Sequence, residues 1–527
     1  MHQNKHICKL AICVIAWLFT GNLRAGEGEL QQTYETQISL SNSKTPLWLN
    51  ANKYGLSSLN QDNGYFRGTL EYNHNTQSKR WSYGAGVDLV VPVGYKSKGY
   101  KDSYTSHIII QQLYADIRYR NFVLSAGSRQ QPLFLKYQGL SSGSQTLGIN
   151  ARPIPQVRLG LDHWWNIPGL HKWVSVMAHG SYGVLTDGEW EESFAKSSGY
   201  KYNKWTRYHE KAGYIRFGNT DRFPLTGIFG LEKAAEFGGY LYHWGGTDQN
   251  GYTAHEKLRL KSNLRSYWNA LVPGGSDTSD KTFHNAEGNQ LGSWIVRFDW
   301  TTPRYVIGLY ADHFFEDHSS MFFLDYDGYG NGADYDTKKD FKFLLYELQD
   351  LMIGIDVKFS HCKFVKGAVI EFINTKYQSG PVYHDHNIGN SDHIGGIDDY
   401  YNHSRLSGWQ HWGQAIGNPL YRSPLYNSNG YIGCSDNRFC AWHFGLEGNF
   451  LSPLSYRVLY TWQQGVGTYR MPFIHKNENT SILAELKFRM PESSSLHHFN
   501  FLCSYGADFG RLLGNNSGIQ LTVQYKL

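Results

Sequence analysis

A polar stretch between residues 400 and 414 places aromatic rings beside amide and imidazole side chains. Sugars present C–H faces that stack on rings and hydroxyl groups that pair with planar polar side chains. We therefore expect carbohydrate contacts here, with Arg152 as the partner of an acidic sugar group. The competing interpretation is that these rings pack a loop against the barrel or lie at the membrane interface. The candidate carbohydrate-binding residues are Arg152, Tyr400, Tyr401, Trp409, His411 and Trp412.

A His/Asp-rich stretch contains residue types that can bind a metal ion. His384 and His386 flank Asp385, with Asp392 and His393 nearby. In an extended chain, His384 and His386 point to opposite faces, so they share an ion only if the chain turns. We predict no metal site and no cofactor, because polar loops collect such residues by chance.

A second group contains the parts of a hydrolase. His313 is followed by Glu316, Asp317 and Ser319, but no Gly-x-Ser-x-Gly elbow and no His-Glu-x-x-His motif occurs. A catalytic base must lie within hydrogen-bond reach of its partner, and the spacing does not establish that. We predict that the protein is not an enzyme and that this group marks a strand end turning into a loop.

Two cysteines lie close together in a polar stretch, Cys434 and Cys440. An exported protein meets an oxidising compartment, so this pair can close a small disulfide loop. Two free thiols are the alternative.

The elements that position these residues are indicated by strict alternation. Ile519, Leu521, Val523, Tyr525 and Leu527 alternate with polar residues to the end of the chain. A strand that crosses a membrane in a barrel needs this period, because one face meets lipid and the other the lumen. The pattern recurs in residues 81–89, 112–119, 294–300, 351–359, 456–463 and 499–506.

The alternating segments favour a membrane barrel over a soluble sandwich. Their polar phase contains Asp88, Arg118, Asp299 and Lys358, which a sandwich core would not accept unpaired. About seventeen candidate strands follow Tyr65, and one more is expected in residues 30–50. We predict an all-β fold, a transmembrane antiparallel β-barrel of about eighteen strands, with sixteen as the alternative. Long polar stretches at 130–155, 185–208, 238–290 and 376–438 are predicted to be extracellular or to fold into the lumen.

The composition agrees with this fold. The 527 residues include 38 Tyr, 28 Phe, 16 Trp and 56 Gly, and the mean hydropathy of −0.49 excludes a helical membrane bundle. Residues 1–25 read as a cleaved signal peptide with a basic start and an apolar run. The predicted layout is a signal peptide at 1–25, an N-terminal lead-in segment at 26–64 and the barrel at 65–527. Cleavage removes three basic residues, which lowers the net charge from +5 to +2, so no nucleic-acid partner is expected.

Ordered segments along the chain resemble the Wzi capsule-assembly family of outer-membrane barrels. The resemblance implies an eighteen-stranded, largely plugged barrel that acts as a surface lectin for capsular polysaccharide. Well-known members also carry a periplasmic helical bundle, but residues 26–64 are short for one and show no helical period. The segments that carry the resemblance are Thr45–Gly55, Leu140–Ser144, Asn150–Gln156, Gly230–Lys233, Phe237–Gly239, His313–Asp317, Gln378–Leu420 and Gly465–Tyr469.

These observations together predict a protein of the cell outer membrane of a Gram-negative bacterium. Its expected role is non-enzymatic binding of capsular or other surface polysaccharide, which helps assemble or attach the capsule. Its other expected partners are outer-membrane lipids and lipopolysaccharide; the oligomeric state stays open. The alternatives are a porin for oligosaccharides and a barrel enzyme that uses His313, Asp317 and Ser319.

Overall fold

The computed structural model describes residues 28–56, 58–74, 80–95, 107–248, 251–272, 288–316, 324–326, 332–334, 337, 341–343, 349–378 and 397–527. The predicted signal peptide at 1–25 lies outside these residues. No helix among them is long and apolar enough to cross a membrane.

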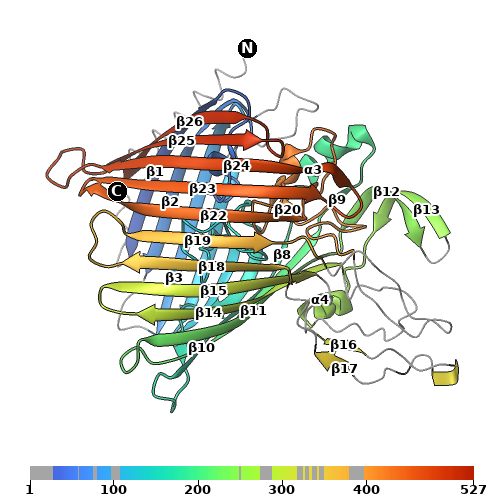
Figure 1. Ribbon diagram of the computed structural model, residues 1–527, viewed down its shortest axis with the longest axis horizontal. Coiled ribbons are helices and arrows are strands. Elements are labelled where there is room, and N and C mark those ends of the chain that lie inside the picture. Colours follow the sequence, from blue (N-terminus) through green and yellow to red (C-terminus); the bar gives the residue numbers. More distant parts are fainter. Residues whose placement is uncertain are drawn as a thin grey trace.

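Eighteen antiparallel strands within the described residues form one closed barrel (Figure 1). Each strand pairs with the next along the chain, and β1 closes the ring by pairing with β26. A two-residue strand, β7 (Trp165–Asn166), adds to the edge of β8. The prediction of about eighteen strands is confirmed. The barrel strands are β1 (Glu29–Ser41), β2 (Asp62–His74), β3 (Trp81–Val93), β4 (Ile109–Tyr119), β5 (Phe122–Ser128), β6 (Gln156–Leu161), β8 (Val174–Val184), β10 (Arg207–Phe217), β11 (Leu225–Phe237), β14 (Asn289–Thr301), β15 (Tyr305–Glu316), β18 (Leu351–Phe359), β19 (Gly367–Asn374), β22 (Phe439–Leu451), β23 (Leu454–Gly467), β24 (Pro472–Arg489), β25 (Phe499–Gly510) and β26 (Asn516–Lys526).

The N-terminal boundary of the barrel differs from the predicted one. Residues 29–41, which were assigned to a lead-in segment, form β1 and pair with both β2 and β26. The strand was hard to delimit because the polar residues Gln32 and Thr36 interrupt its outward series of Leu30, Tyr34, Ile38 and Leu40. β1 is the further strand expected in residues 30–50, and the barrel begins before residue 65.

The alternating faces lie as the sequence predicts. In β26, Leu521 is 54% exposed on the outside of the barrel, whereas its neighbour Gln520 is 1% exposed on the inside. Charges of the polar phase are paired on the inner face. Arg67 Nη2 lies 2.6 Å from Asp88 Oδ2, and Arg297 Nη1 lies 2.6 Å from an oxygen of Asp356. Apolar side chains thus cover the outer face, and paired polar groups occupy the inner face.

The two ends of the barrel differ in loop length. Very short turns at residues 120–121, 302–304 and 452–453 lie at one end, where β1 begins and β26 finishes. The other end carries the long connections, which lie on the right in Figure 1. In outer-membrane barrels the short turns face the periplasm. The long connections contain α3 (Gly188–Ala195), η1 (Lys196–Ser198), β9 (Tyr202–Lys204), β12 (Tyr240–Asp248), β13 (Gly251–Arg259), α4 (Leu264–Leu271), β16 (Leu324–Tyr326), η2 (Gly332–Asp334) and β17 (Phe341–Phe343).

Three connections fold into the lumen, and we call them together the luminal plug: residues 42–56, 129–155 and 397–438. The first contains α2 (Leu47–Asn50); the third contains β20 (Gln410–His411), β21 (Gln414–Ala415) and η4 (Pro424–Tyr426). Their apolar side chains share one core with the inner faces of the strands, including Leu140 with Phe314 and Leu459. The luminal plug therefore occupies the interior of the barrel and packs against its inner wall.

Hydrogen bonds tie the plug to strands far from its own connections. Trp48 Nε1 donates to Thr461 Oγ1 on β23 at 3.1 Å. The hydroxyls of Thr146 and Ser293 (β14) lie 2.7 Å apart. Residues 129–155 link β5 to β6, and β14 lies about a quarter of the way round the ring from these strands. The same segment also reaches the far side of the barrel, where His443 Nε2 on β22 lies 2.8 Å from the backbone oxygen of Leu140.

A charge on the outer face should destabilise the barrel. We expect Leu521→Arg to lower the free energy of unfolding by about 2–4 kcal/mol, since an arginine near the bilayer midplane costs that much in barrels. Leu521→Met is the matched control and should cost less than about 1.5 kcal/mol. Denaturant unfolding in lipid vesicles measures both. Equal stability of the two variants would show that this face does not meet hydrocarbon.

Candidate functional site

Three of the predicted sugar-stacking rings are core residues of the plug. Tyr400, Tyr401 and Trp409 are each 1% exposed. Trp409 Nε1 donates to the backbone oxygen of Thr146 at 3.2 Å, and Tyr400 donates to Asp350 Oδ2 at 3.0 Å. The Tyr401 hydroxyl donates to a backbone oxygen of residue 145. Their predicted role as exposed stacking platforms is therefore wrong, because both faces of each ring are used in packing.

The other three candidates lie together at the long-loop side of the plug. The guanidinium of Arg152 lies over the ring of Trp412, 4.5 Å from its centroid. His411 is buried, with Nδ1 2.9 Å from the backbone oxygen of Arg152 and Nε2 3.1 Å from Thr186 Oγ1. Burial lowers the pKa of His411, and it lowers the pKa of Arg152 to about 10. Arg152, His411 and Trp412 thus lie together in space, and both ring nitrogens of His411 have partners within the protein.

Carboxylates of the α3 region hold this part of the plug in place. Gln410 Nε2 donates to Asp187 Oδ2 at 2.9 Å and to Glu191 Oε1 at 2.8 Å. The backbone N–H of Trp412 also donates to Asp187, at 2.9 Å. The amides next to the tryptophans, which resemble sugar-binding groups in sequence, are therefore engaged within the protein.

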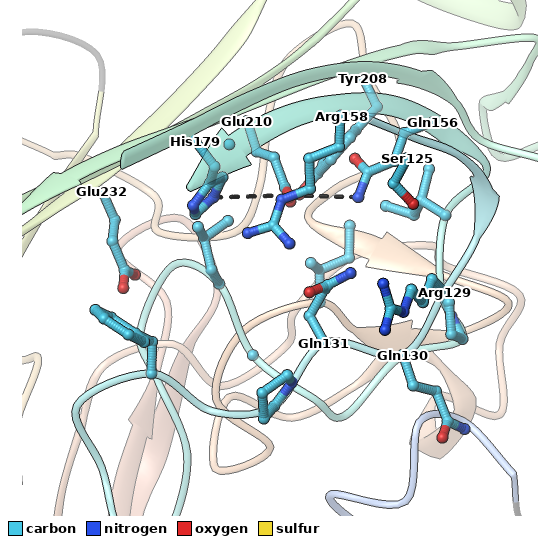
Figure 2. A pocket seen from close by; sticks show the side chains of 18 of the residues that line it. Ser125, Arg129, Gln130, Gln131, Gln156, Arg158, His179, Tyr208, Glu210 and Glu232 are labelled. Atoms are coloured by element: carbon cyan, nitrogen blue, oxygen red, sulfur yellow. Dashed lines mark hydrogen bonds and ion pairs between the residues drawn. The ribbon is translucent and has the colours of Figure 1, made fainter. Parts of the chain in front are cut away.

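A cavity of about 410 Å³ remains between the plug and one side of the barrel wall (Figure 2). The wall side is formed by β5, β6, β8, β10 and β11, and contributes Arg158, His179 and Glu210. The plug side contributes Arg129, Gln130 and Gln131, which Figure 2 shows opposite Arg158. The volume falls within the range of small-molecule sites, roughly 300–1,000 Å³.

The cavity extends along the wall rather than lying at one level. At the long-loop side its lining includes Arg152, and at the other side it includes Leu161 and Asp162, which stand next to a connection at the short-turn end. The six residues of β6 between these levels span about 20 Å. The space therefore follows the length of β6 inside the lumen.

The carboxylates of the wall are held by hydroxyl and amide donors. Glu210 accepts from the Tyr208 hydroxyl at 2.8 Å and from Gln156 Nε2 at 3.3 Å. Glu232 accepts from the Tyr214 hydroxyl at 2.7 Å and from Ser144 at 3.3 Å. Both carboxylates therefore have hydrogen-bond donors within the protein and do not need one from a ligand.

The guanidinium groups of the lining have fewer hydrogen-bond partners than the carboxylates. Arg158 has Glu210 at 3.8 Å from Nε and makes no hydrogen bond with the described residues. The guanidinium of Arg152 stacks on Trp412 and likewise meets no acceptor among the described residues. Arg129, in contrast, forms an ion pair with Asp116. The guanidinium groups of Arg158 and Arg152 can therefore donate hydrogen bonds to a bound molecule, including to a carboxylate.

The remaining candidate groups have other roles or lie outside the described residues. His313 is buried with Nδ1 2.8 Å from the backbone oxygen of Asp350, whereas Asp317 and Ser319 lie outside the described residues. The His/Asp-rich stretch around His384 lies outside them too. Within the described parts of the chain, no group of three or more His, Cys, Asp or Glu side chains is placed to hold a metal.

The proposed disulfide is not formed in the structure. Cys434 and Cys440 are separate thiols. Cys434 Sγ donates to the backbone oxygen of Asp436 at 3.2 Å, while Cys440 Sγ accepts from Lys376 Nζ at 3.2 Å. Cys434 is fixed in the plug and Cys440 begins the ladder of β22, so their short sequence separation does not bring the sulfurs together.

Sequence reasoning missed the wall of the cavity. Arg158, His179 and the amides of Gln130 and Gln131 were not singled out. Arg158 stands in the polar phase of a short alternating strand between Val157 and Leu159, both of which face outward. That phase marks it as luminal, but nothing local marks which luminal residues meet the plug and which meet free space.

The comparisons with known proteins bear on the fold. No protein-family model matches the chain, and no curated protein sequence matches it. Among solved structures, Wzi of Escherichia coli, described as an outer-membrane protein involved in group 1 capsule assembly and a carbohydrate-binding β-barrel, is 12% identical with a TM-score of 0.53, covering 93% of this chain and 83% of that one. At this identity the similarity shows the shared fold, a large barrel of the outer-membrane type.

Two further structures align over nearly the whole chain with lower similarity. Acinetobacter baumannii OccAB4 is 11% identical with a TM-score of 0.45 and covers 96% of this chain and 100% of that one. Pseudomonas aeruginosa OpdH is 10% identical with a TM-score of 0.45 and covers 95% and 99%.

The two tryptophans of the plug should respond differently to truncation. We expect Trp409→Ala to lower the free energy of unfolding by about 3–5 kcal/mol, because it empties a packed core position. Trp412 is only half-buried; Trp412→Ala removes its stack with Arg152 and its packing on the Trp190 cluster, so we expect a smaller loss of about 0.5–3 kcal/mol. Denaturant unfolding in detergent compares them. A larger loss for Trp412→Ala than for Trp409→Ala would contradict the packing described here.

Proposed function

We propose that the protein is an outer-membrane barrel that binds capsular or other surface polysaccharide and helps hold it at the cell surface, without catalysing a reaction. The observation that carries this proposal is the luminal plug, which fills the barrel and leaves a sugar-sized polar cavity in place of a wide pore. The solved barrel of the same fold that is described as carbohydrate-binding, Wzi, supports the choice of ligand class.

The outer surface supports placement in the outer membrane. Exposed apolar side chains cover the strands, and aromatic rings stand near the strand ends, for example Trp81 and Phe122 at the short-turn end. Such rings mark the interfaces of membrane barrels with lipid headgroups. Membrane lipids and lipopolysaccharide are accordingly proposed as its surroundings.

Retention of a polymer does not require a strong single site. A ring that stacks on a sugar contributes roughly 0.5–1.5 kcal/mol, taking aromatic pairs as a guide. A polysaccharide offers many identical units, so weak contacts on many protein copies add by multivalency. The proposed role is compatible with a cavity that recognises only one or two units.

Gene deletion with imaging of the capsule tests the proposal. We expect cells that lack the protein to lose cell-bound polysaccharide while releasing a normal amount into the medium, because synthesis and export do not depend on retention. Re-expression of the unaltered chain is the control and should restore the cell-bound fraction. An unchanged cell-bound capsule in the deletion strain would refute this function.

A second candidate function is passage of oligosaccharides, favoured by the extent of the cavity along β6. A passage requires a continuous opening through the barrel, whereas the three plug segments pack in the lumen. We therefore expect the purified protein to show no steady open conductance in planar bilayers. Replacement of residues 398–435 by a short Gly/Ser linker should create conductance, since it removes most of the longest of the three plug segments. A steadily open unaltered protein would favour the transport role.

A further inference from the structure

The luminal cavity has an excess of unused donors over unused acceptors. Arg158 points its guanidinium into the space from β6 (Figure 2), and the described residues offer its terminal nitrogens no hydrogen-bond acceptor. The side-chain amide of Gln131 faces it from the plug and also has no partner among those residues. A guanidinium has five N–H donors and no acceptor, so what it lacks is an anion or a lone pair.

The acids near these donors do not fill that need. Glu210 is already engaged by Tyr208 and Gln156, and its distance of 3.8 Å to Arg158 is beyond a hydrogen bond. Asp162 lies 3.7 Å from Nε of Arg118. Partly buried cations without hydrogen-bonded anions are costly in a low-dielectric site, and a bound carboxylate would reduce that cost.

Another part of the lining is apolar. Phe134 and Leu147 from the plug and Met177 from β8 contribute to it. Phe134 packs on Tyr214 with ring centroids 4.6 Å apart, which fixes the position of both rings. A cavity with rigid carbon surfaces as well as guanidinium and amide groups matches a molecule that has C–H faces, hydroxyls and one carboxylate.

We propose that this cavity is a binding site for a single carboxylate-bearing sugar unit, with Arg158 as the principal partner of the carboxylate and Gln131 as a partner of the hydroxyls. The proposal rests on the proposed function for the choice of sugars as the ligand class. It adds the charge of the ligand and places its recognition in the lumen, against the β5–β11 wall. The loops that the sequence suggested are not required for this recognition.

Calorimetric titration of the purified full chain in detergent tests the site, with glucuronate and glucose as probes. The two sugars share a ring and differ in charge at one carbon. We expect glucuronate to bind at least about tenfold more tightly than glucose, because hydrogen bonds to charged groups are stronger than neutral ones. Equal affinities, or no binding of glucuronate, would overturn the proposal.

Arg158→Gln should remove the preference for glucuronate, with affinity falling by about tenfold or more. The matched control is Arg304→Gln, which removes the same charge from an exposed short turn and should leave both affinities unchanged. Arg158→Lys keeps the charge and should retain part of the preference, and it serves if Arg158→Gln does not fold. The assignment would be overturned if Arg158→Gln kept the full preference for glucuronate. If that variant does not fold, a full preference in the Arg158→Lys, Gln131→Leu double variant would overturn it.

The capsule assay separates this proposal from the broader one. If deletion of the gene leaves the capsule unchanged while the calorimetric preference holds, the retention role fails and the site stands. If retention depends on the protein while glucuronate and glucose bind equally, the site fails and the retention role stands.

Discussion

Hydrogen bonds between the luminal plug and the inner faces of the strands are the interactions on which this structure depends. A ring of eighteen strands is too wide for its own side chains to fill. Its inner face must then be wet or be covered by other parts of the chain. Here Ser141 donates to Glu371 at 2.5 Å, and Lys136 lies 3.0 Å from Asp312, both across the lumen. Buried polar groups need such partners, so the plug and the polar wall stabilise each other.

The strands were largely predictable because lipid on one side imposes a period of two. The positions of Leu521 and Asp88, one facing outward and the other inward, follow from that period alone. β1 was harder to delimit, because Gln32 and Thr36 interrupt the apolar series on its outer face. Its pairing with β26 depends on closure of the ring, which is a property of the whole chain.

The candidate site was less predictable for a different physical reason. A loop rich in tyrosine and tryptophan reads the same whether it extends into water or packs inside a barrel. Tyr401 and Trp409 do the second, and their buried faces cannot meet a sugar. Arg152, which the sequence suggested as the partner of an acidic sugar group, lines the cavity, and its role in binding stays a prediction. Arg158 was missed, since every luminal strand residue has the same local pattern and only the shape of the plug distinguishes it.

The filled lumen therefore depends on the placement of residues 129–155 inside the barrel. Oxidative cross-linking of a Thr146→Cys, Ser293→Cys double variant measures that placement most directly, because the two hydroxyls are 2.7 Å apart although Thr146 lies in the plug and Ser293 on the barrel strand β14. We predict a disulfide between positions 146 and 293, identified by mass spectrometry of the folded protein. Failure of this pair to cross-link in correctly folded barrels, with both thiols freely alkylated from solvent, would contradict a filled lumen.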